Sequence, residues 1–213
     1  MQEKDKNNTE WRILEAAKKV FVLKGKDGAR MQEIADTAGI NKSLLHYYYR
    51  SKEKLFHAVF RFAISVSAPK MFEIFSSGAN SFNAIEVFIS EYMDLLKKHP
   101  FIPMFILGEV SKKETHFVID VIKNSGVNVD GFCRLIEHDI ENGLLRKNIN
   151  PKELLVNIIS LCVFPVIGRP LLGVIIFDND TAKYDAFLND RKRQVTDLII
   201  HSIATNYSNY QNK

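Results

Sequence analysis

A chain of 213 residues is long enough to bury a substantial core in one large or two small domains, and its apolar content of 46% fits a folded protein. Residues 1–60 hold 12 Lys and Arg against 8 Asp and Glu, whereas residues 61–213 hold 17 of each, so the net charge of +4 lies at one end. This distribution is expected if the N-terminal end binds a polyanion, and it is also compatible with a solvated surface that binds nothing.

Membrane and secreted classes are disfavoured by the apolar runs, the cysteines and the N-terminus. The longest uncharged run, residues 154–168, has 15 residues, short of the roughly 18 to 20 needed to span a bilayer. Cys133 and Cys162 lie in apolar surroundings, where packed thiols are expected in a reducing compartment, and no metal-site spacing is present. Residues 1–8 are polar, unlike a signal peptide, and are expected to be a disordered tail. We expect a cytoplasmic protein without a cofactor.

The first predicted helix follows Thr9, a residue type that caps helix N-termini. Gly25 lies just past its end, and residues 26–30 form a linker. This helix is expected to close the core of a small domain. Its apolar stripe consists of Ile13, Ala16, Ala17, Val20 and Phe21.

Residues 31–55 have the pattern of two short helices joined by a tight turn and followed at once by a third helix. Gly39 supplies the turn, and Asn41 is a favourable N-cap for the second helix. A helix-turn-helix with a short, basic and aromatic outer face can lay the start of its second helix in the major groove of DNA. The outer face carries Lys42, Ser43, His46 and Tyr47. The inner face carries Met31, Ile34, Ala35, Ala38, Leu45, Tyr48 and Tyr49.

The third helix is capped by Ser51 and carries Lys52 in its first turn. A cation there opposes the helix dipole, which favours a phosphate docked on the free backbone amides of that end. We expect residues 51–70 to link two domains, with Pro69 breaking or kinking the helix.

The rest of the chain predicts further helices and no strand of useful length, so the predicted fold class is all-α. Pro165, Gly168, Pro170 and Gly173 should disrupt the continuation of the helix at 151–168. That helix is apolar on more than one face and needs cover from two sides. Loops are expected at 76–80 and 177–181. Helices are expected at residues 82–99, 101–110, 115–123, 129–142, 151–168 and 181–207.

The run from Ile13 to Leu55 resembles the DNA-binding domain of the TetR family of bacterial transcriptional regulators. The matching features are a helix closed by Gly25, the segment IADTAGI, the helix SLLHYYY and the junction SKEKLF. The resemblance implies a helix-turn-helix DNA-binding domain at 1–50, a linking helix at 51–70 and an effector-binding and dimerisation domain at 71–213. It also implies a homodimer joined through about 151–168 and 181–207 that reads a palindromic operator in double-stranded DNA and is released by a small effector.

Nine residues are candidates for contact with DNA, several of them at positions where the family commonly touches it. Arg30 stands where the family usually has a small hydroxyl residue, which removes a helix cap but offers a charge. Leu44 stands where threonine is frequent, and it can read only a thymine methyl group. The candidates are Arg30, Gln32, Asn41, Lys42, Ser43, Leu44, His46, Tyr47 and Lys52.

Aromatic residues in the middle of the chain are candidates for lining an apolar effector cavity, because small-molecule sites are mostly apolar with few polar groups. Ordinary helical core is the alternative for each of them. The candidates are Phe88, Tyr92, Phe101, Phe105, Phe132 and Phe164, with Glu109 or Cys133 as a polar element.

Two other function classes compete with a DNA-binding regulator. A helical enzyme would use His116 with Asp120, or the cluster Glu137, His138, Asp139 and Glu141, but consecutive residues spread around a helix instead of converging. No phosphate loop, HExxH, GxSxG or paired cysteine motif is present. A protein-interaction module would use the helix-turn-helix only as a scaffold and would show no salt-dependent binding of DNA.

Overall fold

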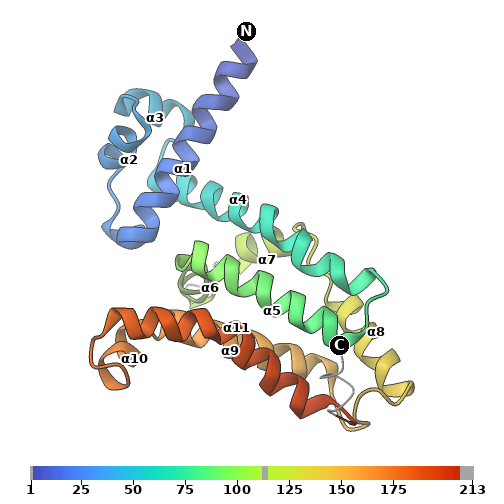
Figure 1. The fold of residues 1–213 in the computed structure, drawn as a ribbon. Coiled ribbons are helices and arrows are strands. Elements are labelled where there is room, and N and C mark those ends of the chain that lie inside the picture. The colour runs from blue at the N-terminus through green and yellow to red at the C-terminus, as the bar shows by residue number, and fades with distance from the viewer. Residues whose placement is uncertain (1, 112–114, 207–213) are drawn as a thin grey trace. The chain divides into compact units, whose positions relative to one another are not determined.

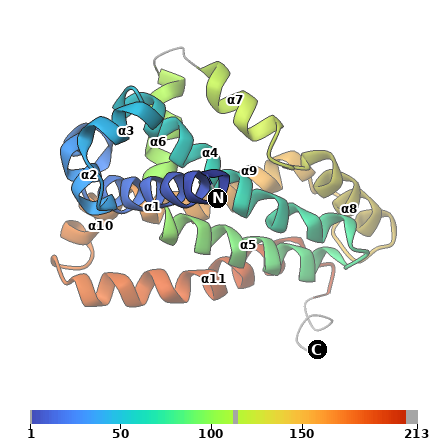
Figure 2. The ribbon, with the colours of Figure 1, turned by 90° about the horizontal axis from the view of Figure 1, so that it is seen from above.

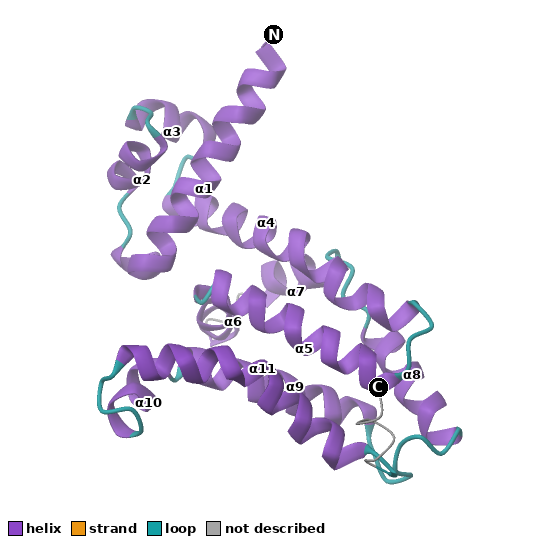
Figure 3. Ribbon diagram, viewed as in Figure 1, coloured by secondary structure: helices purple, strands orange, loops and turns teal. Residues whose placement is uncertain are grey.

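The computed structural model describes residues 2–111 and 115–206, and every regular element there is a helix apart from one isolated bridge between Leu145 and Ala204 (Figures 1 and 3). The predicted all-α fold is therefore confirmed. Residues 1–66 with 99–115 form one compact unit, and residues 67–98 with 116–213 form a second. The division falls at residue 66, inside the linking helix predicted at 51–70, and residues 99–115 belong with the first unit.

Five helices build the first unit. They are α1 (Gln2–Gly28), α2 (Met31–Ala38), α3 (Lys42–Tyr48), the first part of α4 (Lys52–Glu73) and α6 (Phe101–Ser111). Helix α1 packs against α2 and α6, and α2 packs against α3. The predicted apolar stripes supply this core, in which the buried residues include Ile13, Ala17, Phe21, Ile34, Ala35, Leu45, Leu55 and Phe56.

Helix α1 begins at Gln2, so the predictions of a disordered tail at residues 1–8 and of a helix start at Thr9 are wrong from residue 2 onward. Glutamate and lysine have good helix propensity, and a helix nucleated by its buried turns is extended by polar residues at little cost. Near its other end α1 is kinked at Gly25, where φ is 67° and ψ is 178°, and one further turn reaches Gly28.

Helix α4 runs through Pro69 to Glu73, so the predicted break does not occur at the proline. Proline removes one backbone donor. The helix continues because its apolar side stays packed, as the burial of Ala68 and Phe72 shows. The expected loop at 76–80 is present between the short 3₁₀ helix η1 (Ile74–Ser76) and α5 (Ser81–Lys98).

The second unit contains η1, α5, α7 (Thr115–Lys123), α8 (Val129–Glu141), α9 (Pro151–Ile167), α10 (Arg169–Ile175) and α11 (Thr181–Ile203). Helices α5, α9 and α11 pack against one another, and α8 packs against α5 and α9 (Figures 1 and 2). Their contact surface is apolar. Buried side chains include Ile85, Ile89, Phe88, Phe132, Ile158, Cys162, Tyr184, Val195 and Ile200.

Side-chain caps define several helix starts in this unit. The carboxamide oxygen of Asn128 accepts the amide hydrogen of Gly131 at 2.7 Å, and Asp180 accepts that of Lys183 at 3.0 Å. Two of the last helices differ from the prediction. Helix α10 forms where prolines and glycines predicted disruption of a helix. It can form because Pro170 occupies its first turn, where no backbone donor is needed. Helix α11 ends at Ile203, and the predicted end at residue 207 lies outside the described residues.

In the described part of the chain, no single helix is long and apolar enough to span a membrane. Helices α9 and α10 together reach the length and apolar character that a span requires, but they are bent by 72° relative to each other. One bent pair is weak evidence for a span, since the core helices of a globular protein have the same composition.

Candidate nucleic-acid interface

The turn between α2 and α3 is fixed by backbone geometry and by a cation from α1. Gly39 has φ 65° and ψ 38°, the left-handed conformation that glycine adopts at low cost, and the amide of Ile40 donates to the carbonyl of Ala35 at 3.0 Å. The guanidinium of Arg12 donates to the carbonyl oxygens of Ala38 at 2.6 Å and Gly39 at 3.3 Å. Arg12 thus satisfies carbonyl groups that the end of α2 leaves without an intrahelical partner.

Helix α3 is anchored at both ends. Asn41 caps it as predicted, since its side-chain oxygen accepts the amide hydrogen of Leu44 at 2.7 Å. Leu45 is fully buried, and the buried Tyr49 donates its hydroxyl hydrogen to Glu10 at 3.0 Å. Burial and the neighbouring Glu10 carboxylate raise the pKa of Tyr49 well above its usual range, so the hydroxyl stays a donor. The orientation of α3 relative to α1 is therefore fixed.

Tyr48 departs from the predicted core assignment. Its side chain is only half-buried, and its ring makes an edge-to-face contact with Tyr47 at a centroid distance of 5.6 Å. Tyr47 is 72% exposed, so the pair forms an aromatic step on the surface beside α3. Such a step can contact sugars or base edges without any rearrangement of the core.

The predicted DNA-contacting residues other than Lys52 are all exposed. Among the described residues Arg30 makes no capping hydrogen bond at the start of α2, which confirms that its presence removes a cap. Gln32 donates to the Asp36 carboxylate at 2.8 Å, so it must leave that partner to contact a base. Leu44 is 37% exposed and offers only apolar atoms. The structure thus brings eight of the nine candidates to the surface of α2, α3 and their flanks.

Lys52 is placed differently from the prediction. Its ammonium group donates to the backbone carbonyls of Asp27 and Ala29, each at 3.1 Å, and its side chain is partly buried. These carbonyls belong to the last turn of α1 and the linker to α2. A cation at a helix C-terminus is favourable, which explains its presence in the first turn of α4 without a phosphate. Ser51 caps α4 as predicted, accepting the amide hydrogen of Lys54 at 3.2 Å.

Neither Arg12 nor Lys52 was identified from the sequence as a residue that holds the helix-turn-helix together. Arg12 is followed 26 residues later by its acceptor Ala38, and Lys52 follows Ala29 by 23 residues. Backbone carbonyl acceptors carry no residue type, so the sequence contains no signal for these contacts.

The predicted effector residues are divided between the two units. Phe101 lies in the first unit, where its ring contacts Phe56 at 5.5 Å. The side chains of Phe105 and Glu109 lie outside the described part of the structure. The remaining candidates, Phe88, Tyr92, Phe132, Cys133 and Phe164, belong to the second unit.

In the second unit the candidate rings pack directly on one another. Phe75 contacts Phe88 at 5.4 Å and Phe132 at 5.1 Å, and Phe88 also contacts Tyr92 at 5.8 Å and Phe72 at 5.3 Å. Phe72 and Phe75 were missed because they follow Pro69, where the sequence predicted a break or kink of the helix. These contacts describe a filled aromatic core at this place.

Three other candidates of the second unit have distinct surroundings. Burial raises the pKa of the Cys133 thiol, and raises that of Cys162 to about 12, so both are neutral packed thiols as predicted. Phe164 is 54% exposed on α9 and lines no core in the single chain. The carboxylate of Asp139 is buried and accepts the amide hydrogen of Ser81 at 2.8 Å, so it caps α5 and is not a solvated surface group. His138 lies beside it and is exposed.

Comparison with known proteins agrees with this architecture. The chain matches "Bacterial regulatory proteins, tetR family" over residues 13–59 and "Tetracyclin repressor-like, C-terminal domain" over residues 82–199. It is 28% identical to the HTH-type transcriptional repressor NicS of Pseudomonas putida over 154 residues, which cover 71% of this chain and 73% of NicS. It is 35% identical to the HTH-type transcriptional repressor SCO4008 of Streptomyces coelicolor over 100 residues, 47% of this chain and 48% of that protein.

A solved structure, the transcriptional regulator FadR from Bacillus subtilis in complex with stearoyl-CoA, has the same fold with a TM-score of 0.63. It is 17% identical and covers 89% of this chain and 97% of its own. The second family match by itself spans more than half of the chain. With a preorganised helix-turn-helix followed by that C-terminal domain, the chain belongs to the tetR family of bacterial regulatory proteins and is a DNA-binding transcriptional regulator.

Proposed function

We propose that this regulator binds a palindromic operator as a homodimer and represses transcription until a small apolar effector releases it. The observation that carries the proposal is the exposed face of α3 on a turn held by Arg12 and Gly39. A rigid turn presents the start of α3 to the major groove without an ordering cost at the time of binding. We expect the regulator to act in the cytoplasm, where its operator is.

Within this proposal the nine candidate residues have different roles. Lys42, Ser43, Leu44, His46 and Tyr47 face the groove or the adjacent phosphates, because they are exposed on α3. Arg30 and Gln32 contact the backbone or a base edge from α2. Asn41 and Lys52 act mainly on the protein, by capping α3 and by holding the end of α1.

The homodimer is supported by apolar side chains exposed on the two helices that the resemblance assigns to the interface. Val156 and Phe164 are more than half exposed on α9, and Leu198 is more than half exposed on α11. Large apolar side chains gathered on a surface favour association. Two heads related by a twofold axis then read half-sites about one helical turn apart, which a single head cannot do.

The effector is proposed to bind in the second unit, as the complex of FadR with stearoyl-CoA suggests for a protein of the same fold. The aromatic core around Phe75 and Phe88 would have to open to admit a ligand, because its rings are in contact. Opening of a packed core by a ligand is a population shift, and it can move α4, which begins in the first unit.

Quantitative DNA binding tests the proposal. Replacement of Tyr47 by Ala should weaken operator binding, because the side chain is exposed and contributes only a surface contact to the fold. Leu23→Ala is the matched control, since Leu23 is 80% exposed on α1. Equal affinity of Tyr47→Ala, Leu23→Ala and the unmodified protein for operator DNA at several salt concentrations would contradict this assignment of the interface.

A further inference from the structure

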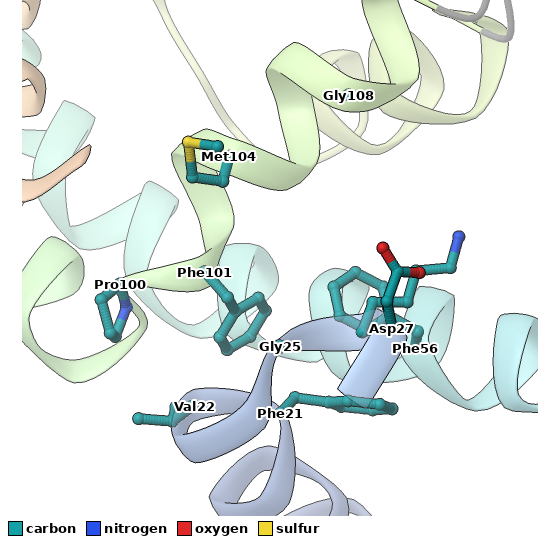
Figure 4. Close-up of a pocket in the computed structure, with 10 residues that line it drawn as sticks. Phe21, Val22, Gly25, Asp27, Phe56, Pro100, Phe101, Met104 and Gly108 are labelled. Atoms are coloured by element: carbon teal, nitrogen blue, oxygen red, sulfur yellow. The ribbon is translucent and has the colours of Figure 1, made fainter. Parts of the chain in front are cut away.

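A cavity of about 400 Å³ opens in the first unit between the end of α1, the start of α4 and helix α6 (Figure 4). Its size lies within the range of small-molecule sites, about 300–1,000 Å³. It is separate from the aromatic core of the second unit, which the proposed function assigns to the effector. All of its walls belong to one compact unit, so its shape does not depend on the placement of the other.

Three phenylalanine rings form the floor of the cavity. Phe21 and Phe56 are in edge-to-face contact at 4.7 Å, and Phe56 and Phe101 are in a similar contact at 5.5 Å. All three rings are buried, while Val22 and Met104 at the rim are exposed. Figure 4 shows Phe101 below Met104. An aromatic ligand packed against Phe101 would extend this edge-to-face series and remove the rim side chains from water.

Two glycines leave the space open. In the described structure a Cβ atom on Gly25 or on Gly108 would meet no atom within 4 Å, and both glycines line the cavity. Gly25 has positive φ, so other residues are strained there. Gly108 lies inside α6 and has ordinary helical φ, although glycine weakens a helix by about 1 kcal/mol relative to alanine. A side chain at 108 would therefore suit the helix and occupy the cavity.

The polar edge of the cavity carries charges of both signs. The ammonium group of Lys26 lies 5.7 Å from the centre of the Phe56 ring and is bonded to the Glu53 carboxylate at 2.5 Å. Lys52 is bonded to backbone carbonyls nearby. The Asp27 carboxylate is exposed and has no ion-pair partner among the described residues, which leaves it as an acceptor. Balanced charge with a free acceptor favours a neutral ligand that donates a hydrogen bond.

We propose that this cavity binds a small neutral aromatic compound whose ring packs against Phe101 and the exposed Val22 and Met104 and whose N–H or O–H group donates to Asp27. An occupant contacts the segment from Gly25 to Asp27, and the carbonyl of Asp27 is one of the two that Lys52 holds before α2 begins. Binding would therefore stabilise the connection between α1 and the helix-turn-helix. The site neither requires the effector of the second unit nor depends on operator binding.

Calorimetric titration of the full chain with indole and with 1-methylindole tests the proposal without DNA. The unmodified protein should bind indole in the millimolar range or tighter, and 1-methylindole more weakly because it lacks the donor. In Asp27→Ala the two probes should bind equally. Gly108→Leu should weaken indole binding at least tenfold by filling the cavity. Gly173→Leu should leave binding unchanged, because Gly173 also lies inside a helix with open space around its Cβ position but belongs to α10.

A second variant guards against misfolding of Gly108→Leu. Met104 is 57% exposed at the rim, so Met104→Glu should fold normally and place a carboxylate at the entrance, again weakening indole at least tenfold. Circular dichroism melting of each variant establishes folding. Absence of indole binding by the unmodified protein at 5 mM, or unchanged binding in a folded Gly108→Leu or Met104→Glu variant, would overturn the proposal and leave the assignment of the DNA interface intact.

Discussion

Lys52 is expected to act on the protein and not directly on DNA. Replacement by Met keeps the aliphatic stem and removes the ammonium group that donates to Asp27 and Ala29 at 3.1 Å each. At a net value of about 0.5–1.5 kcal/mol per hydrogen bond, and with the side chain partly exposed, the pair contributes about 1.5 kcal/mol to stability. For a chain of this length that free energy corresponds to a fall in Tm of roughly 3–6 °C.

Lys42→Met is the matched control for this prediction. Lys42 is exposed in the first turn of α3, and no ion pair of its ammonium group occurs among the described residues. Its loss should leave Tm unchanged. If Lys42 contacts a phosphate, its loss should reduce the dependence of log K on log salt by about one unit. Lys52→Met should show the opposite pair of results, a lower Tm with an unchanged salt slope.

Differential scanning calorimetry without DNA and operator titration at four salt concentrations measure the two quantities on the same preparations. An unchanged Tm for Lys52→Met together with a slope reduced by one unit would refute the reasoning. In that case the ammonium group leaves its backbone carbonyls and binds a phosphate. This is the role that the sequence predicted for a cation in the first turn of α4.

Three further predictions address the turn, the dimer and the thiols. Arg12→Met removes the donors to the carbonyls of the turn, so it should lower Tm by a similar 3–6 °C and weaken operator binding. Scanning calorimetry and operator titration measure these two effects. Phe164→Glu should raise the dimer dissociation constant at least tenfold in sedimentation equilibrium. Ile119 is 42% exposed on α7, and Ile119→Glu should leave the constant unchanged. A dimer unaffected by Phe164→Glu would exclude this face as the interface. Because burial raises the pKa of Cys162 to about 12, its thiol is protonated at pH 8 and should react with Ellman's reagent only after unfolding; rapid reaction of the native protein would contradict this.

The helix-turn-helix could be predicted from the sequence because its determinants are local. Ile34, Ala35 and Leu45 recur at helical spacing and are buried, and Gly39 and Asn41 terminate and begin helices through contacts within four residues. Periodicity likewise located α5 and α8. Local chemistry of this kind leaves a clear signal in the amino-acid types.

Contacts between distant segments could not be predicted in the same way. Lys52 matched a phosphate-binding position by its place in α4, but its nearest acceptors are carbonyls in the last turn of α1 and in the linker that follows it. The aromatic candidates illustrate a second cause. Periodicity identifies Phe88 as inward-facing, yet whether its neighbours fill the interior depends on Phe75, which lies beyond Pro69 in a segment for which no helix was predicted. Phe164 is exposed because no other helix of the described chain covers its side of α9, and the sequence does not show which side is covered.

Hydroxyl-radical footprinting on the DNA that flanks the protein's own coding region tests the central claim most directly. A homodimer whose α3 helices enter the major groove should protect two related patches with centres about one helical turn, 34–36 Å, apart. Protection should weaken in the Tyr47→Ala variant, because the Tyr47 side chain is exposed on α3. A single unpaired patch, or no protection at low salt where phosphate contacts are strongest, would contradict a dimeric operator-binding regulator.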